Sequence, residues 1–325
     1  MIRRFLALFE PFILMLLGTV LLASLLPARG MWAGVFGWAA DAGIVLLFFL
    51  HGAKLSREAI LDGARNWRLH GVTLGTTFVI FPLLGLALSA LPLMDRPLEA
   101  GLLFLTLLPS TVQSSIAFTA IARGNVAAAV CSASFSNLAG IVVTPALVAL
   151  LMHGHGNAMS WKSVESILLQ LLLPFALGHA LRPLIGGFVT RHKPLMTVVD
   201  RGSILLVVYA AFGAAVVEGL WHKLSGADLA LLALLCALLL GIVLAITYAM
   251  GRALGFRRED QIVLLFCGSK KSLASGVPMA GVLFPPAQVG LVILPVMLFH
   301  QIQLIACALI ARRYADQPSP PSPSA

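Results

Sequence analysis

The sequence predicts an all-α polytopic membrane protein with ten transmembrane helices. Hydrophobic residues make up 59% of the 325-residue chain and charged residues only 11%, with a mean hydropathy of +0.97. A helix needs about 20 apolar residues to cross the hydrocarbon core of a bilayer. Windows of that length fill nearly the whole chain, at 9–27, 33–53, 69–92, 98–122, 126–152, 163–186, 201–220, 228–252, 260–284 and 287–311.

The positions of lysine and arginine support this count, because cytoplasmic loops of membrane proteins carry an excess of both. With ten spans, sixteen of the 22 basic residues fall on one side of the membrane and four on the other. Both termini are therefore expected in the cytoplasm, and the plasma membrane, specifically the inner membrane of a bacterium, is the expected location. The net charge of +9 reflects this topology. No soluble domain is left to offer a basic surface to a nucleic acid, so the predicted partners are the lipid bilayer and a small-molecule substrate.

The remaining two basic residues, Lys270 and Lys271, are adjacent and lie inside the ninth predicted span. A charge at the bilayer centre costs about 2.5 to 3.5 kcal/mol and is by default evidence of a functional site. Ser269 and Ser272 flank the pair, within a stretch of small and polar residues that lets a helix break and expose its backbone. The sequence therefore predicts a transport site centred on these four residues.

A second interrupted segment, 107–124, occupies the fourth predicted span and matches 265–281 when it is moved by 157 residues. Each segment is the fourth span of a five-span half, and five is odd, so the two halves must insert with opposite orientations. This alignment pairs Gln113 with Lys270, Ser114 with Lys271 and Ser115 with Ser272. The sequence thus predicts two inverted repeats, at 1–156 and 157–314, followed by a disordered Pro/Ser-rich tail at 315–325.

Several strings together resemble the bile acid:sodium symporter superfamily, and within it the branch similar to the seventh member of solute carrier family 10. They are Phe48-Phe-Leu-His-Gly-Ala-Lys-Leu-Ser56, Leu108-Pro-Ser-Thr-Val-Gln-Ser-Ser115, Ala122-Arg-Gly-Asn125, Thr144-Pro145 and Phe299-His-Gln301. The resemblance covers all ten spans. It implies a panel domain (helices 1, 2, 6 and 7) beside a core domain (helices 3 to 5 and 8 to 10), in which discontinuous helices 4 and 9 cross. It also implies secondary active transport by alternating access, and we expect an organic anion or an amphipathic acid as the substrate.

The chain departs from that superfamily at the sodium ligands. Where sodium-coupled members carry a glutamate on the ninth helix, this chain has Phe266 or Cys267, and the Gln-Asn pair that follows is replaced by Lys270-Lys271 or Lys271-Ser272. An ammonium repels sodium, so sodium is not favoured as a cofactor.

We expect instead that one lysine ammonium takes the place of a bound sodium. Burial disfavours the charged form of a lysine, so this residue could load and release a proton or could stay charged and attract an anionic substrate. Two adjacent helical side chains point about 100° apart, so the other lysine is expected to be structural. The expected hydrogen-bond partners are Gln113, Ser114 and Ser115, with side chains among Ser132, Ser134, Ser136 and Asn137.

Three alternatives stay open at this point. Both lysines could simply hold the helix break, the chain could be a sodium-coupled symporter with relocated ligands, or it could be a membrane regulator of cation entry that transports nothing. No metal-binding spacing of cysteine and histidine and no catalytic motif appears, so neither a metal site nor an enzyme is predicted.

Two further residues are candidates for the site. Asp41, inside the second predicted span, is either a proton or cation site, or a counter-ion of a lysine, or else a neutral carboxylic acid hydrogen-bonded to Trp38 or to a carbonyl. His300 belongs to the tenth span, which is expected to pack beside the ninth.

Overall fold

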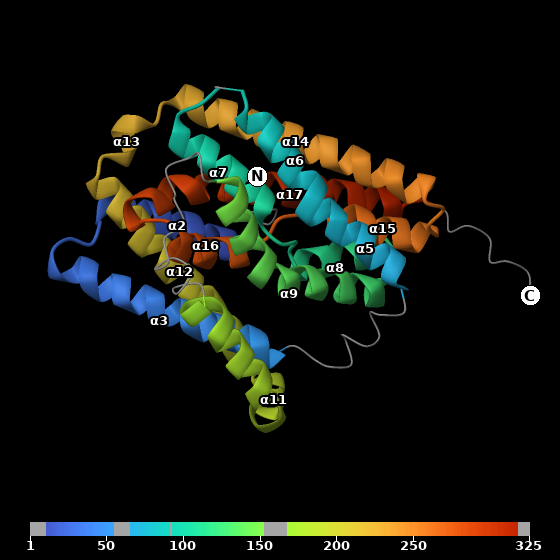
Figure 1. Cartoon of the computed structure of the whole chain (residues 1–325), viewed down its shortest axis with the longest axis horizontal. Helices are drawn as coiled ribbons and strands as arrows, with labels where there is room; N and C mark the ends of the chain where they lie inside the picture. The colour runs from blue at the N-terminus through green and yellow to red at the C-terminus, as the bar shows by residue number, and fades with distance from the viewer. Residues whose placement is uncertain (1–10, 55–65, 92, 153–167, 318–325) are drawn as a thin grey trace, which may run out of the picture.

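The computed structural model describes residues 11–54, 66–91, 93–152 and 168–317, and within these ranges the chain is helical, with no strand. In Figure 1 the helices form a bundle that is elongated along the horizontal axis. They are α2 (Pro11–Leu25), α3 (Met31–Lys54), α5 (Trp67–Gly75), η2 (Thr76–Ile80), α6 (Phe81–Ser89), α7 (Arg96–Leu107), α8 (Gln113–Ile121), α9 (Val126–Leu151), η4 (Leu168–Leu172), α11 (Leu173–Arg191), α12 (Lys193–Val217), α13 (Leu220–Lys223), α14 (Gly226–Ala253), α15 (Arg258–Gly268), α16 (Leu273–Leu283) and α17 (Pro286–Ala315).

Seven continuous helical segments in the described part of the chain are long and apolar enough to cross a membrane. They are Met31–Lys54, Trp67–Ser89, Val126–Leu151, Leu169–Arg191, Lys193–Val217, Gly226–Ala253 and Pro286–Ala315. The predicted all-α membrane class is confirmed. The predicted boundary between the repeats at 156 and most of the predicted tail lie outside the described residues.

One predicted boundary is wrong by eight residues. The segment expected at 201–220 begins at Lys193, because Pro194 at the start of α12 favours helix initiation and the polar first turns still form helix. Arg201, the first residue of the predicted span, therefore lies in the third turn of α12.

Two predicted spans are each broken near the middle. Helix α7 ends at Leu107 and α8 begins at Gln113, while α15 ends at Gly268 and α16 begins at Leu273. Figure 1 shows α7 and α16 on the left of the molecule and α8 and α15 on the right, so the two breaks meet near its centre. There the backbone N–H of Ser272 donates to the carbonyl of Pro109 at 2.8 Å.

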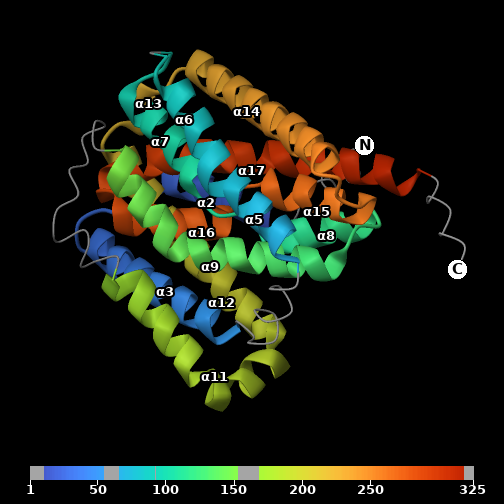
Figure 2. The ribbon, with the colours of Figure 1, turned by 45° about the vertical axis from the view of Figure 1, so that its right-hand side comes forward.

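The remaining helices divide into two groups. Helices α3, α11 and α12 pack together at the lower edge of Figure 2, with α2 against α12, and the other long helices pack around the breaks. The contact between α3 and α11 is close, because a Cβ added at Gly52 would lie 2.0 Å from the carbonyl oxygen of Phe175. Hence α3 and α11 approach at backbone distance, as small residues allow.

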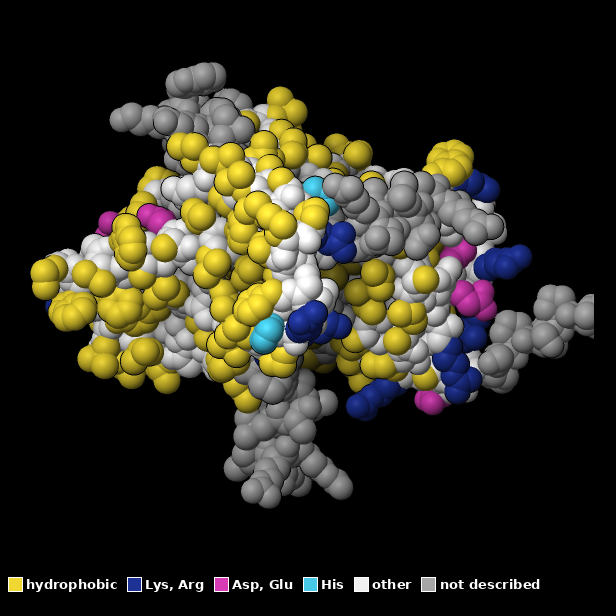
Figure 3. Space-filling model, turned by 90° about the horizontal axis from the view of Figure 1, so that it is seen from below, with side chains coloured by type: hydrophobic (Ala, Val, Ile, Leu, Met, Phe, Trp, Pro, Cys, Tyr) yellow, Lys and Arg dark blue, Asp and Glu magenta, His cyan; other side chains and the backbone are white. Residues whose placement is uncertain are grey.

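The surface agrees with a membrane environment. Figure 3 shows hydrophobic side chains over most of the face in view, with many of the lysine and arginine side chains at the end where the chain terminates. Arg252, Arg257, Arg312 and Arg313 are among the exposed basic residues near that end of the sequence.

Candidate transport site at the two helix breaks

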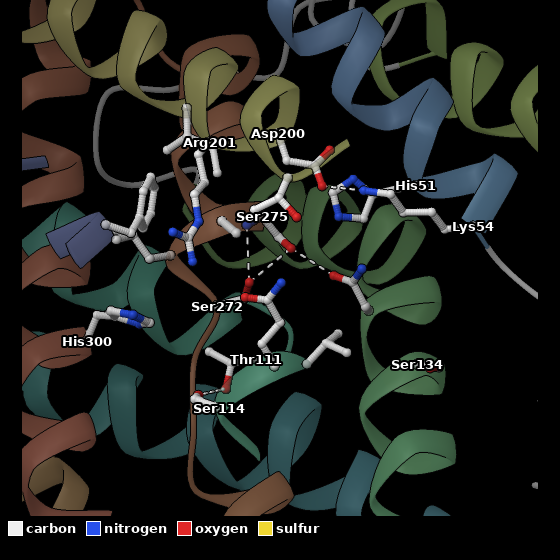
Figure 4. Close-up of a pocket in the computed structure, with 18 of the residues that line it drawn as sticks. His51, Lys54, Thr111, Ser114, Ser134, Asp200, Arg201, Ser272, Ser275 and His300 are labelled. Carbon is white, nitrogen blue, oxygen red and sulfur yellow. Dashed lines mark hydrogen bonds and ion pairs between the residues drawn. The ribbon is translucent and has the colours of Figure 1, made fainter. Parts of the chain in front are cut away.

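A cavity of about 350 Å³ lies between the two breaks and the α3/α12 pair (Figure 4). One wall, formed by the breaks, α9 and α17, is polar but uncharged, and we call it the hydroxyl wall. The other wall, formed mainly by α3 and α12, carries the charged side chains, and we call it the charged wall. The hydroxyl wall contains Thr111, Gln113, Ser114, Ser134, Asn137, Ser272, Ser275 and His300, and the charged wall contains His51, Lys54, Thr197, Asp200 and Arg201.

Hydrogen bonds hold the hydroxyl wall in place. Ser272 caps the start of α16, since its Oγ accepts from the N–H of Ser275 at 3.1 Å. Ser275 Oγ donates to Asn137 Oδ1 at 2.7 Å, and the hydroxyls of Thr111 and Ser114 lie 2.8 Å apart. The wall therefore presents a fixed set of hydroxyl and amide groups to the cavity.

Lys271 is fully buried behind that wall, and its ammonium is bound by three backbone carbonyls. Nζ donates to Thr77 at 2.8 Å and to Thr106 and Leu108 at 2.7 Å each. The ring of Phe81 lies 4.1 Å from the same ammonium. Three carbonyl oxygens and an aromatic face satisfy a buried cation much as a metal-ion site would.

Those carbonyls are available because the local sequence removes their usual donors. The N–H of Phe81 bonds to Thr76, and residue 82 is proline, so no N–H is left five residues after Thr77 for the π-helical turn to use. This leaves the Thr77 carbonyl pointing at Lys271.

The same reasoning applies to the end of α7. The N–H of Ser110, four residues after Thr106, donates instead to Ser136 Oγ at 2.9 Å. Leu108 lies beyond the helix end and is extended before Pro109. A cation here also faces the negative end of the α7 dipole, which stabilises it.

Gln303 fixes both the backbone of Lys271 and the ring of His300. Its Oε1 accepts from the N–H of Lys271 and its Nε2 donates to the Lys271 carbonyl, each at 2.9 Å. Gln303 Nε2 also lies 2.8 Å from His300 Nδ1. A donating amide makes Nδ1 the acceptor, so the assigned tautomer of His300 carries its proton on Nε2. His300, on the cavity wall, can then donate that proton in a hydrogen bond.

Lys270 is also fully buried but is held much less firmly. Its Nζ lies 3.4 Å from Ser114 Oγ, a long contact, and 4.1 Å and 5.5 Å from the ring centres of Phe118 and Phe266. Because Ser114 lines the cavity, Lys270 is connected to the cavity through one hydroxyl.

The structure brings most of the predicted site residues together, but not as predicted. Of the expected partners only Ser114 contacts a lysine ammonium; Ser115 Oγ donates to the Phe266 carbonyl at 3.1 Å, and Gln113 starts α8 at the cavity. Ser136 bonds to Ser110, and Ser132 bonds to His70 at 2.7 Å. Ser269 Oγ, just past the end of α15, donates to the carbonyl of Leu265 in that helix. The backbone carbonyls around Lys271 bind its ammonium in place of the expected side chains, because they carry large dipoles and have no other donor.

The predicted alignment by 157 residues does not superimpose the two breaks. Helix α8 begins at Gln113 and α16 at Leu273, 160 residues later. Lys270 and Lys271 therefore correspond to the non-helical Ser110 and Thr111, and not to the first turn of α8. The alignment is wrong by three residues because it matched small polar letters, whereas Pro109 sets the position of the first break.

Asp41 lies on an exposed face of α3 and is not among the described residues that line the cavity. In the described part of the chain the one ion pair is between Lys54 and Asp200, so Asp41 has no lysine partner there. No group of three or more His, Cys, Asp or Glu side chains in the same residues is arranged to hold a metal ion.

A buried cation at two helix breaks, beside a polar cavity in a helical membrane protein, is typical of membrane transporters. The chain belongs to the SBF-like CPA transporter family, whose model matches residues 10–316. It is 52% identical over 310 residues to a protein of Escherichia coli (strain K12) named "Putative symporter YfeH", covering 95% of this chain and 93% of that one. It is 55% identical over 311 residues to an uncharacterised protein of Pseudomonas aeruginosa, covering 94% and 93%.

A rat protein named sodium/bile acid cotransporter 7 is 26% identical over 272 residues, covering 81% of this chain and 78% of its own length. The predicted resemblance to the bile acid:sodium symporter superfamily is thereby confirmed. The chain is a transporter-family protein and not an enzyme.

Proposed function

We propose that this protein is a ten-span secondary transporter that moves an organic anion or amphipathic acid by alternating access, with Lys271 as a built-in cation in place of a bound sodium. The carbonyl cage around the Lys271 ammonium is the observation that carries the proposal. An ion-coupled carrier needs a cation at crossed broken helices to offset the carbonyls exposed there. Here a side chain supplies that charge permanently.

The ten spans follow if each broken helix counts as one crossing and α2 as another. Five crossings then lie before residue 153 and five after residue 167, which supports inverted repeats at 1–156 and 157–314. The packing of α2, α3, α11 and α12 as one group supports the panel domain, and the group around the breaks supports the core. Basic residues on one side favour cytoplasmic termini, and the bacterial relatives favour the bacterial inner membrane.

Lys270 is the residue we assign to coupling. A fully buried ammonium with one long hydrogen bond is costly to keep charged, and Ser114 gives it a path to the cavity. Loss of its proton when the cavity opens to one side, and recovery on the other, would couple transport to protons.

The charge around the cavity supports an anionic substrate. The helix N-termini of α8 and α16 both lie at the breaks, and the positive ends of helix dipoles favour anions. This effect acts in a low-dielectric pocket, where it is stronger than in water.

Thermal stability of the purified protein in sodium, compared with potassium at equal ionic strength, tests the built-in cation. We expect no sodium effect on the wild type. Lys271→Ala should lose stability in potassium and regain part of it in sodium, because sodium can enter the vacated carbonyl cage. At a concentration of 100 times its Kd, a bound ligand raises the free energy of unfolding by about 2.7 kcal/mol, which is readily measured.

Lys270→Ala is the matched variant, since it removes a buried lysine but leaves the cage intact. It should show no sodium-specific gain in stability and should lose proton-driven flux in liposomes. A sodium-stabilised wild type would instead support a sodium-coupled symporter with relocated ligands. Absence of any substrate-dependent flux in the wild type would support the non-transporting regulator.

A further inference from the structure

We propose that a second copy of this chain packs against the exposed face of α3, and that Asp41 of each copy accepts the indole N–H of the partner subunit's Trp38. The protein is then a two-fold symmetric dimer in the membrane. This inference goes beyond the proposed transport function and depends neither on the substrate nor on the coupling ion.

Asp41 lies near the middle of a membrane span, on a side of the helix that the rest of the chain leaves open. It is ten residues after the start of α3 at Met31 and thirteen before its end at Lys54. Helix α3 packs against α11 and α12 at the lower edge of Figure 2. Asp41 belongs to the exposed face of α3 and has no hydrogen bond or ion pair with any described residue.

A carboxyl group in that position needs a polar partner. Asp41 is about 15 Å along the helix from the nearer end of α3, so its short side chain cannot extend to the aqueous surface as a lysine can. Ionisable residues inside membrane spans almost always face the protein interior or a water-filled cavity and pair with another polar group. The exposed apolar side chains beside Asp41 need no cover in lipid, whereas its carboxyl group does.

Trp38 is the hydrogen-bond donor on the same face. It lies one turn before Asp41, its side chain is 75% exposed, and its indole N–H has no acceptor among the described residues. Tryptophan is enriched at membrane interfaces, where the indole N–H can meet water or headgroups, but Trp38 is about 10 Å along α3 from its start. The face therefore carries one acceptor and one donor without partners, a single turn apart.

A second copy supplies the missing partner to both groups. Copies of one membrane protein share an orientation, so a two-fold axis perpendicular to the membrane places two α3 helices side by side with equal residues at equal depth. Each Asp41 then lies one turn from the partner subunit's Trp38, and two reciprocal hydrogen bonds form. Gly34 and Ala42 on this face are small enough for close approach, and a Cβ added at Gly34 would have nothing within 4 Å in its own chain.

Cysteine cross-linking in membranes tests which face of α3 meets the second copy. The four native cysteines are buried, so a cysteine introduced on the surface of α3 is the reactive one. Val45 and Leu46 are exposed neighbours that point about 100° apart, and Val45, one turn after Asp41, is on its side of the helix. We expect copper phenanthroline to give a disulfide-linked dimer with Val45→Cys and to leave Leu46→Cys monomeric. Any other pattern overturns the proposed face.

Energy transfer between labelled copies of the full chain, measured in liposomes at increasing lipid dilution, gives the dissociation constant of the dimer. We expect Asp41→Leu and Trp38→Phe each to raise it by at least about tenfold, as loss of hydrogen bonds between membrane helices should. Asp41→Asn keeps an acceptor and should dissociate as the wild type does. Trp32→Phe is the control, because Trp32 is the exposed tryptophan at the start of α3.

The double variant Asp41→Leu/Trp38→Phe distinguishes a direct contact from two independent effects. It should dissociate no more readily than either single variant, because all three lack the same hydrogen bonds. A wild type that stays monomeric at every density, single variants that match it, or additive losses in the double variant overturn the proposal. If the wild type is monomeric and Asp41→Leu loses flux, Asp41 is a proton or cation site, and the dimer fails while the transport function stands.

Discussion

Replacing Lys271 with methionine is expected to lower the free energy of unfolding by roughly 3 kcal/mol or more, since a buried acceptor left without a donor costs about 1–3 kcal/mol. The change removes the ammonium that donates to the carbonyls of Thr77, Thr106 and Leu108. Methionine has a similar length, so the loss of hydrogen bonds and not of volume dominates. The removal of a buried charge offsets part of this cost, but three acceptors at one point outweigh it.

Lys270→Met provides the comparison. It removes the same charge from an equally buried position but breaks one contact of 3.4 Å, so its stability should stay near that of the wild type or exceed it. Unfolding in detergent, followed by tryptophan fluorescence, compares the two variants. Equal stabilities for both methionine variants would show that the carbonyl cage contributes nothing.

The class of fold and the location of the site were predictable from the sequence because both depend on the cost of placing charge in lipid. Apolar windows and basic residues predict the membrane segments, and two lysines inside one window mark the site. The distinct surroundings of Lys270 and Lys271 were also expected, though for the wrong reason. Both lie in a non-helical stretch, so the 100° spacing of a helix does not apply; Lys271 instead reaches the carbonyls of η2 and the end of α7, and Lys270 reaches Ser114 of α8.

The ligands of Lys271 could not be predicted in the same way. They are backbone carbonyls from η2, the last turn of α7 and the break that follows, and no side-chain type marks them. Pro82 and Pro109 were the available signal, because Pro82 removes the N–H that would reach the Thr77 carbonyl and Pro109 favours the extended Leu108 that ends α7. Their significance depends on which segment lies opposite, which is tertiary information.

The charged wall was missed because hydropathy windows reject polar helical turns. Thr197, Asp200 and Arg201 lie in the first three turns of α12, and the cavity supplies the polar surroundings that a lipid-facing helix would lack. Lys54 and Asp200, 146 residues apart, meet only after α3 and α12 pack. Long-range pairing of this kind has no local signal.

Valine at Gly178 is expected to abolish correct packing of α3 against α11 and with it the recovery of folded protein. A Cβ at Gly178 would lie 1.9 Å from the carbonyl oxygen of Phe49, and the reciprocal contact at Gly52 is as short. Real Cβ atoms do not approach a backbone oxygen that closely, and neither group is a side chain that can rotate away. The helices must separate, which moves His51 and Lys54 off the charged wall.

Gly187→Val, on the same helix, is the matched control, since nothing lies within 4 Å of its added Cβ. Both changes carry the same modest helix-propensity effect, well under about 1 kcal/mol, so propensity cannot explain a difference between them. Size-exclusion chromatography of the detergent-solubilised protein should give a single sharp peak for Gly187→Val and aggregated or no protein for Gly178→Val. A well-folded Gly178→Val would mean that α3 and α11 do not touch at backbone distance, and the α3 contribution to the charged wall would then have to be placed differently.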